Sequence, residues 1–333
     1  MTGLEAATGD GRSAGMQSSS SSGAHRDLWQ GFAFGSLTCL IWGIQPLVSK
    51  RAFVDGLTPV DVTLLRFLAA GLVLLPATLR ARPFPVGRLG WRRACVLTIV
   101  AGAPFSLMVV GGVAFAPPLH SAVIPPGLIP VVAMALAYFV MREVPALSEL
   151  ASLALVVCGL VLFSYEALSG APSREGAWLG DVIFAAAAVM WASFGFLGNR
   201  WHADPVGATA AIAILSLLSI PLWAFWQPLG LFSASLSGLA LQALYQGVLV
   251  GAVSLYLYRR AVELLGPVRA ALFVSPVPLV TATVDLVYLG ELPSRLEASG
   301  MVAVVLGMML STLAPARTER ASRGVTPPGS LAP

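Results

Sequence analysis

Long apolar runs alternate with short polar connections along most of the chain. A helix that crosses a membrane needs about 20 mostly apolar residues. Ten runs meet this requirement, and the connections between them are short and rich in glycine, proline or charge. The pattern therefore predicts an all-α polytopic membrane protein with ten transmembrane helices. These are expected over Gly31–Ala52, Val62–Leu79, Ala94–Ala114, His120–Met141, Ser148–Leu168, Leu179–Arg200, Pro205–Trp226, Leu239–Arg260, Val268–Leu289 and Leu296–Ala314.

Composition supports the same class. The chain is 57% hydrophobic and only 11% charged, and its mean hydropathy is +0.82, whereas a soluble domain carries about 25% charged residues. A net charge of +4 would suggest a nucleic-acid partner in a soluble chain. In a membrane protein, basic loop residues set the topology instead. We therefore expect the chain to lie in a lipid bilayer and to have no nucleic-acid partner. Residues 1–28 and 315–333 are polar and are predicted to be disordered tails.

A set of proline, glutamate and glycine positions occurs twice. Pro130, Glu143, Pro145, Glu149 and Gly159 recur 148 residues later as Pro278, Glu291, Pro293, Glu297 and Gly307. The repeat divides the chain into halves at 29–168 and 176–314, each with five predicted helices. Because five is odd, the second half must enter the membrane inverted relative to the first. Duplicated halves in a membrane protein point first to a transporter.

Basic residues are distributed unevenly between the two predicted sides. Fifteen of the 20 lie in the tails and loops on the side of both termini, and only four lie on the other side. The positive-inside rule therefore predicts that both termini are cytoplasmic. Lys50 and Arg51 are exceptions at the outer end of the first helix. They either extend to the outer headgroups or face a substrate pathway.

Two of the predicted helices contain clustered helix breakers. The fourth carries Pro125, Pro126, Gly127 and Pro130, and the ninth carries Ser275, Pro276 and Pro278. An internal proline removes a backbone donor and clashes with the preceding turn. Non-helical backbone at membrane depth is tolerated where it is buried or lines a cavity. We predict that both helices are broken and line one cavity, the alternative being a simple packing kink.

Arg66 and Asp285 are ionisable residues inside predicted spans. Counted from the outer ends of their helices, they lie about 6 Å and about 9 Å deep. Charges in lipid are costly, so a pair or a wet cavity is expected. We predict that Asp285 pairs with Arg66 or Lys50 in at least one state and takes part in coupling or gating. The alternative is an acid that is protonated or solvated near the headgroups.

Aromatic and polar residues accompany the expected cavity helices. We predict that the cavity is lined by Trp42, Gln45, Gly127, Pro130, Trp191, Tyr245, Tyr256, Ser275 and Pro278. His120 begins the fourth helix and is expected to be an interfacial residue. No metal-binding, phosphate-binding or nucleophile motif is present, so no catalytic residue, cofactor or metal is expected.

Several short motifs, in order along the chain, resemble those of the drug/metabolite transporter superfamily in its branch with two EamA domains. They are Ile41-Trp42-Gly43, Arg66-Phe67, Trp191-Ala192, Tyr245-Gln246-Gly247, Leu257-Tyr258-Arg259-Arg260-Ala261, Leu265-Gly266-Pro267, Pro278 and Leu289-Gly290-Glu291. The resemblance implies a bacterial inner-membrane carrier in which helices one to four and six to nine surround a central cavity. It also implies export of amino acids, other metabolites or toxic compounds without ATP. One departure is Met141-Arg142-Glu143, where the family usually has Leu-Gly-Glu.

The leading hypothesis is therefore a secondary transporter that exports a small molecule by alternating access. The expected partners are the bilayer and this small-molecule substrate, with a homodimer as an option. The alternatives are an intramembrane enzyme acting on lipid and a channel. The enzyme would need convergent histidine or acidic residues near a headgroup, and the channel a charged or polar ring through a pore.

Overall fold

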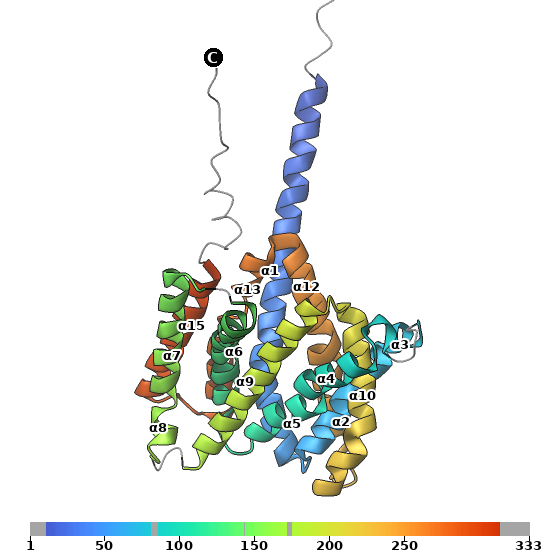
Figure 1. The fold of residues 1–333 in the computed structure, drawn as a ribbon, viewed down its shortest axis with the longest axis vertical. Coiled ribbons are helices and arrows are strands. Elements are labelled where there is room, and N and C mark those ends of the chain that lie inside the picture. Colours follow the sequence, from blue (N-terminus) through green and yellow to red (C-terminus); the bar gives the residue numbers. More distant parts are fainter. Residues whose placement is uncertain (1–10, 81–85, 143, 172–174, 314–333) are drawn as a thin grey trace, which may run out of the picture.

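The computed structural model describes residues 11–80, 86–142, 144–171 and 175–313, and this part of the chain contains helices and no strand. Figure 1 shows a bundle from which α1 projects at one end. The helices of the first half are α1 Gly11–Val54, α2 Pro59–Val73, α3 Leu75–Arg80, η1 Gly87–Leu89, α4 Trp91–Ala101, α5 Ala103–Gly112, α6 Pro118–Met141, α7 Leu147–Phe163 and α8 Tyr165–Leu168. Those of the second half are α9 Ala177–Arg200, α10 Pro205–Trp226, α11 Leu236–Gln242, the π-helix η3 Ala243–Val253, α12 Ser254–Leu265, α13 Pro267–Ala271, α14 Val277–Leu289 and α15 Arg295–Leu313.

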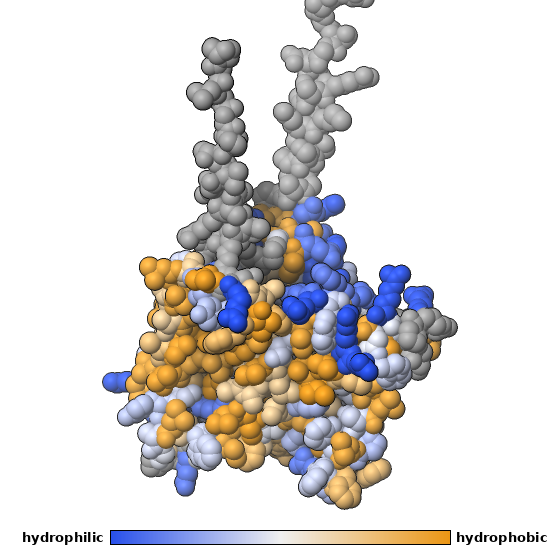
Figure 2. Space-filling view, viewed as in Figure 1, coloured by the Kyte–Doolittle hydropathy of each residue, from blue (hydrophilic) through white to orange (hydrophobic). Residues whose placement is uncertain are grey.

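Each of the ten predicted segments coincides with one or more of these helices. Within the described residues, seven helical runs are long and apolar enough to cross a membrane, and α7 and α14 are shorter apolar helices. Large apolar side chains are exposed over the outside of the bundle, and Figure 2 shows them as a broad orange surface. An apolar outer surface of this kind suits contact with lipid tails. Helix α1 begins at Gly11, inside the predicted tail 1–28; residues 1–10 and 314–333 lie outside the described residues.

The packing of the helices is symmetric under exchange of the two halves. In the first half α1 packs on α12 and α14 of the second, and its counterpart α9 packs on α4, α5 and α6. The pairs α2–α10, α6–α14 and α7–α15 each join a helix to its own counterpart. In Figure 1, α1 and α9 run in opposite directions through the bundle. We call the end of the bundle where α6, α9 and α15 begin the outer end; it lies opposite the end from which α1 projects.

The start of α2 is fixed by its own sequence and by the second half. Thr58 and Asp61 form a capping box, in which the Asp61 carboxylate accepts the Thr58 backbone N–H at 2.8 Å and the Thr58 hydroxyl accepts the Asp61 N–H at 3.2 Å. The same carboxylate accepts the backbone N–H of Gly230 at 2.9 Å. Asp61 is therefore a structural acid that ties α2 to the segment after α10.

The predicted break in the fourth helix is wrong. Helix α6 continues from Pro118 to Met141 with Pro125, Pro126 and Pro130 inside it. The predicted break in the ninth segment is confirmed, because α13 ends at Ala271 and α14 begins at Val277. Other irregularities lie elsewhere: α4 and α5 are interrupted at Gly102, and η3 carries a π-helix, a form that is rare and frequent at functional sites.

Helix α6 ends on a left-handed arginine. Arg142 has φ 58° and ψ 28°, and Gly290, its counterpart 148 residues later, has φ 68° and ψ 13° at the end of α14. The departure from the family's Leu-Gly-Glu therefore leaves the turn unchanged. It instead places a side chain where glycine is favoured, because the left-handed region costs a non-glycine residue about 1–2 kcal/mol.

Replacing Arg142 with glycine should raise the free energy of unfolding by about 1 kcal/mol, because the strain at the helix end is removed. The matched change is Gly290→Ala, at a site where a Cβ would meet no atom within 4 Å. It should lower stability by a similar amount through backbone strain alone. Thermal unfolding of the detergent-solubilised variants measures both, and shifts of the same sign would contradict the assignment.

Candidate functional site

A buried polar network lies where α1 and α2 of the first half meet η3 of the second. Arg66 is at its centre, seven residues into α2 and about 10 Å from its outer end, deeper than the sequence indicated. Its Nη1 donates to the Ser106 hydroxyl at 3.3 Å, and its Nη2 donates to Gln246 Oε1. The Gln246 amide donates to Ser49 at 2.8 Å, and the Gln45 amide donates to Gln246 at 3.4 Å.

Among the described residues, no acid forms an ion pair with Arg66. The residue is 8% exposed. Its Nε is also without a hydrogen-bond partner. Buried charges are normally paired, because removing a charge from water is expensive. Arg66 is thus held by neutral oxygens in a setting that favours an anion.

Two aromatic residues lie close in sequence to members of this network, Trp42 before Gln45 on α1 and Tyr245 before Gln246 on η3. Trp42 donates its indole N–H to Ser254 at 2.9 Å and packs on Tyr258, with ring centroids 5.5 Å apart. Tyr245 donates its hydroxyl to the Ile41 carbonyl at 2.9 Å. Trp191 instead belongs to an aromatic stack, with its ring centroid 4.9 Å from that of Phe105. The structure therefore places Gln45 in the Arg66 network, Trp42 and Tyr245 at the adjoining contacts of α1 with α12 and η3, and Trp191 in a separate stack.

Other predicted cavity residues lie elsewhere. Tyr256 is 61% exposed on the outside of α12, so it does not belong to an internal cavity. Gly127 is buried against Leu160 and Val304, where a Cβ would come within 3.2 Å of each. The absence of a side chain at Gly127 allows α6 to pack closely on α7 and α15. Pro130 lies in the same continuous α6. Ser275 is buried in the break before α14, and Pro278 is buried in the first turn of α14.

A second polar cluster lies at the outer end, and it corrects the prediction for His120. This residue is 1% exposed rather than interfacial. Its Nδ1 is 2.6 Å from the Asp181 carboxylate of α9, and its Nε2 is 3.3 Å from the Glu297 carboxylate of α15. The Phe163 ring of α7 packs edge-on against it at 4.8 Å. His120 thus joins three helices through both ring nitrogens.

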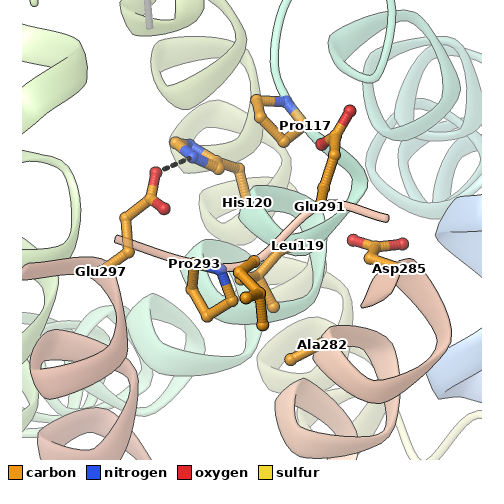
Figure 3. A pocket seen from close by; sticks show the side chains of 9 residues that line it. Pro117, Leu119, His120, Ala282, Asp285, Glu291, Pro293 and Glu297 are labelled. Atoms are coloured by element: carbon orange, nitrogen blue, oxygen red, sulfur yellow. Dashed lines mark hydrogen bonds and ion pairs between the residues drawn. The ribbon is translucent and has the colours of Figure 1, made fainter. Parts of the chain in front are cut away.

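Asp285 lies in the same region and not with Arg66. It is 3% exposed and lines a small pocket with His120, Glu291 and Glu297, as Figure 3 shows. Its carboxylate takes a hydrogen bond from the backbone N–H of Leu119, in the first turn of α6, and Oδ1 has no partner. No ion pair of the described residues joins it to Arg66 or Lys50. In this state of the protein the predicted pair is absent, and Asp285 belongs with His120.

A second pocket is larger and mostly apolar. It has a volume of about 510 Å³ and lies at the outer ends of α1, α2, α5 and α10, lined mainly by side chains such as Phe53, Leu57, Trp223 and Trp226. No charged residue lines it. Thr58 and Gln227 are its polar lining residues. The Arg66 network offers more of the placed polar groups that give a binding site its specificity, so it is the better candidate for the substrate.

Comparison with known proteins decides the family. The sequence model of the EamA-like transporter family matches residues 29–165 and 178–313, which are the two predicted halves. The chain belongs to the EamA-like transporter family. It is thus a multi-pass membrane protein of a family of transporters, and the resemblance read from its motifs is confirmed.

A solved crystal structure supports the fold of this EamA-like chain. It is 19% identical in sequence, covers 85% of this chain and 96% of its own, and superposes with a TM-score of 0.57. At this identity the likeness concerns the fold alone. No curated protein matches the sequence.

Sequence reasoning missed how the outer cluster of this EamA-like protein is assembled. Asp181 lies two residues inside the predicted sixth span, at the same end as His120, and that depth was the available signal. Glu297 was noted only as a repeat position. Its second oxygen accepts the Ser294 N–H at 2.8 Å and caps α15, as Glu149 caps α7 by accepting the Ala146 N–H at 2.8 Å.

Proposed function

We propose that this EamA-like chain is a secondary transporter that exports a small metabolite carrying a negatively charged group. The observation behind the proposal is Arg66, a buried cation without an acidic partner where the two halves meet. A planar guanidinium binds a carboxylate through two parallel hydrogen bonds. An amino acid or another organic acid has the charge for such a site.

The neighbouring residues suit the same substrate. Gln45, Gln246, Ser49 and Ser106 supply amide and hydroxyl groups that can exchange their present hydrogen bonds for bonds to a ligand. Trp42 and Tyr245 add aromatic surface for its apolar part. The site lies between α2 of one half and η3 of the other, so a movement of one half against the other would expose it to one side and then the other.

The proposal includes the ten-helix inverted repeat, the inner membrane as its location and cytoplasmic termini. The excess of basic residues on one side supports this orientation. A reporter fused after Ala314 should therefore be active in the cytoplasm, and one inserted near Gly230 should be active outside. A terminal fusion that is active only outside would contradict the arrangement.

Uptake into everted membrane vesicles tests the transport activity itself. Vesicles from cells that overproduce the chain should accumulate one or more members of a panel of radiolabelled amino acids and organic acids. Control vesicles lacking the chain should not. Accumulation of amines or neutral compounds alone would refute the proposed substrate class. Absence of any uptake by a chain that is inserted and cooperatively folded would refute export of such acids.

A further inference from the structure

The cluster around His120 is separate from the proposed substrate site. It consists of one histidine held between two carboxylates. Both ring nitrogens of His120 face carboxylate oxygens, Asp181 at 2.6 Å and Glu297 at 3.3 Å. The three residues come from α6, α9 and α15, and each is at most 6% exposed. The His120 side chain therefore links the outer ends of three helices. If one of its two contacts breaks, these helix ends are free to separate.

The hydrogens in this arrangement can be counted. A neutral imidazole carries one N–H and one bare nitrogen, and an ionised carboxylate only accepts. With a neutral ring and two carboxylates, one of the two contacts would bring lone pairs together. Two hydrogen bonds therefore need one more proton, either on the imidazole or on one of the carboxyl groups. The observed geometry of His120, Asp181 and Glu297 is that of the proton-loaded cluster.

We propose that His120, Asp181 and Glu297 form a proton-binding site that holds the outer ends of α6, α9 and α15 together. When the proton leaves, one link must break, because only one N–H remains for two acceptors. The longer contact, between His120 and Glu297, is the one expected to open. The released proton goes to water, and the cluster gains one negative charge.

The pocket beside the cluster supplies a route for that proton. It is lined by His120, Glu297, Asp285 and Glu291 and has a volume of about 10 Å³, enough for about one water molecule. Glu291 is exposed and Asp285 is 3% exposed, so the lining of the pocket extends from an exposed acid to the buried ring. Figure 3 shows Glu291, Asp285 and His120 around this pocket.

Two buried carboxylate oxygens at the cluster are able to accept a further proton or hydrogen bond. Asp181 Oδ2 and Asp285 Oδ1 are buried without a hydrogen-bond partner. The acidic groups that face the site from every packed element are Asp181, Glu297, Asp285 and Glu291, and Lys50 of α1 is the cation that acts on Asp285 from a distance. The chain thus places one histidine among four acids.

The cluster joins the two halves at one end of the bundle and is not repeated at the other end. The positions equivalent to His120 and Asp181 under the repeat are Val268 and Phe32. A proton bound at one end only would favour closure of the outer end and not of the inner one. If the proposed export is correct, this asymmetry would make the outer opening sensitive to protons and so couple their movement to that of the substrate.

The test measures opening of the pocket without any substrate, so its failure is separate from a failure of the proposed export. The native cysteines Cys39, Cys95 and Cys158 are replaced, and a reporter cysteine is introduced as Ala282→Cys, which lines the pocket. A small charged thiol reagent is applied from outside to the reconstituted protein, and the rate of labelling is measured. The labelling ratio is the rate for Ala282→Cys divided by the rate for Phe232→Cys, a site that is 98% exposed.

The ratio should rise about tenfold from about pH 5 to about pH 9, which corresponds to about 1.4 kcal/mol. In His120→Gln, which cannot take up a proton, the ratio should stay constant over the same range. In Asp181→Asn the rise should be lost, because the asparagine amide can donate to a neutral ring and both links then survive without the extra proton. The matched control is Glu149→Gln, which changes the equivalent cap in the other half and should keep the wild-type profile.

Two results would overturn the proposal. The first is a flat ratio in the protein with His120 intact. The second is an unchanged rise in His120→Gln, which would assign the opening to Asp285 or Glu291. Cooperative thermal unfolding of each variant shows that it is folded. If His120→Gln does not fold, Asp181→Asn decides alone, and a wild-type profile in that variant contradicts the proton site.

Discussion

Replacing Arg66 with glutamine should reduce the affinity for an exported acid about 10- to 100-fold, and transport in proportion. The change removes the cation that we propose binds the anionic group, and a hydrogen bond to a charged group is worth about 1.5–3 kcal/mol. Uptake into everted vesicles at several substrate concentrations measures the effect. Arg66→Lys should recover only part of the activity, because a lysine keeps the charge but not the paired donors.

Stability should respond to the same change in the opposite direction. Arg66 is a buried charge without an acidic partner, and such a charge is costly to bury. The substrate-free Arg66→Gln protein should therefore unfold at the same temperature as the wild type or at a higher one. The control is Arg260→Gln, whose exposed ion pair with Glu263 should matter little to either property. A large loss of stability in Arg66→Gln would assign Arg66 to the fold instead of the substrate.

A second large effect is expected at Gly300, where α15 crosses α7. A Cβ there would lie 2.5 Å from the Phe163 nitrogen and 2.6 Å from the Gly159 oxygen. Both are backbone atoms that no rotamer change can move, so the helices must separate. Overpacking costs about 1–3 kcal/mol and occasionally more. We expect Gly300→Ala to cost about 3 kcal/mol, and Gly300→Val to prevent stable folding.

The comparison site is Gly195, also inside a helix. A Cβ at Gly195 would meet nothing within 4 Å. Gly195→Ala should therefore be neutral or raise stability by about 0.5–1 kcal/mol, through the better helix propensity of alanine. Thermal unfolding of the purified proteins separates the two. Similar losses at Gly195 and Gly300 would mean that close approach of α7 and α15 is not the cause.

The features that could be predicted from the sequence are those carried by long apolar runs and by the repeat. Each predicted span coincides with helices, because some 20 apolar residues in a row have few other solutions. The duplicated residues also predicted related halves, and the family match divides the chain at the same place. Gly159 and Gly307 even recur at the same crossing, since Gly307 packs on Val156 and Ser152 of α7.

Irregular backbone was predicted poorly, because it depends on neighbours. Three prolines in α6 did not break that helix, whereas the run from α4 to α5 is interrupted at Gly102, two residues before the single Pro104. Prolines inside a membrane helix are tolerated when the surroundings satisfy the freed backbone groups. A single sequence does not show which neighbouring groups surround a given turn of helix.

Side-chain partners across helices were the least predictable part of the site. Asp285 was expected beside Arg66 because both seemed to lie at similar depth, but depth does not specify which face of the bundle a residue occupies. His120, Asp181 and Glu297 are distant in sequence, and only the packing of α6 against α9 and α15 brings them together. Any of them considered alone resembles an ordinary residue near a helix end.

The central claim is that Arg66 binds the anionic group of the substrate. Calorimetric titration of the purified protein with an exported acid and with its methyl ester tests this claim most directly. We predict that the wild type binds the acid at least about tenfold more tightly than the ester, and that Arg66→Gln binds the two about equally. A preference for the acid that is unchanged in Arg66→Gln would show that the anion is bound elsewhere and would contradict the account.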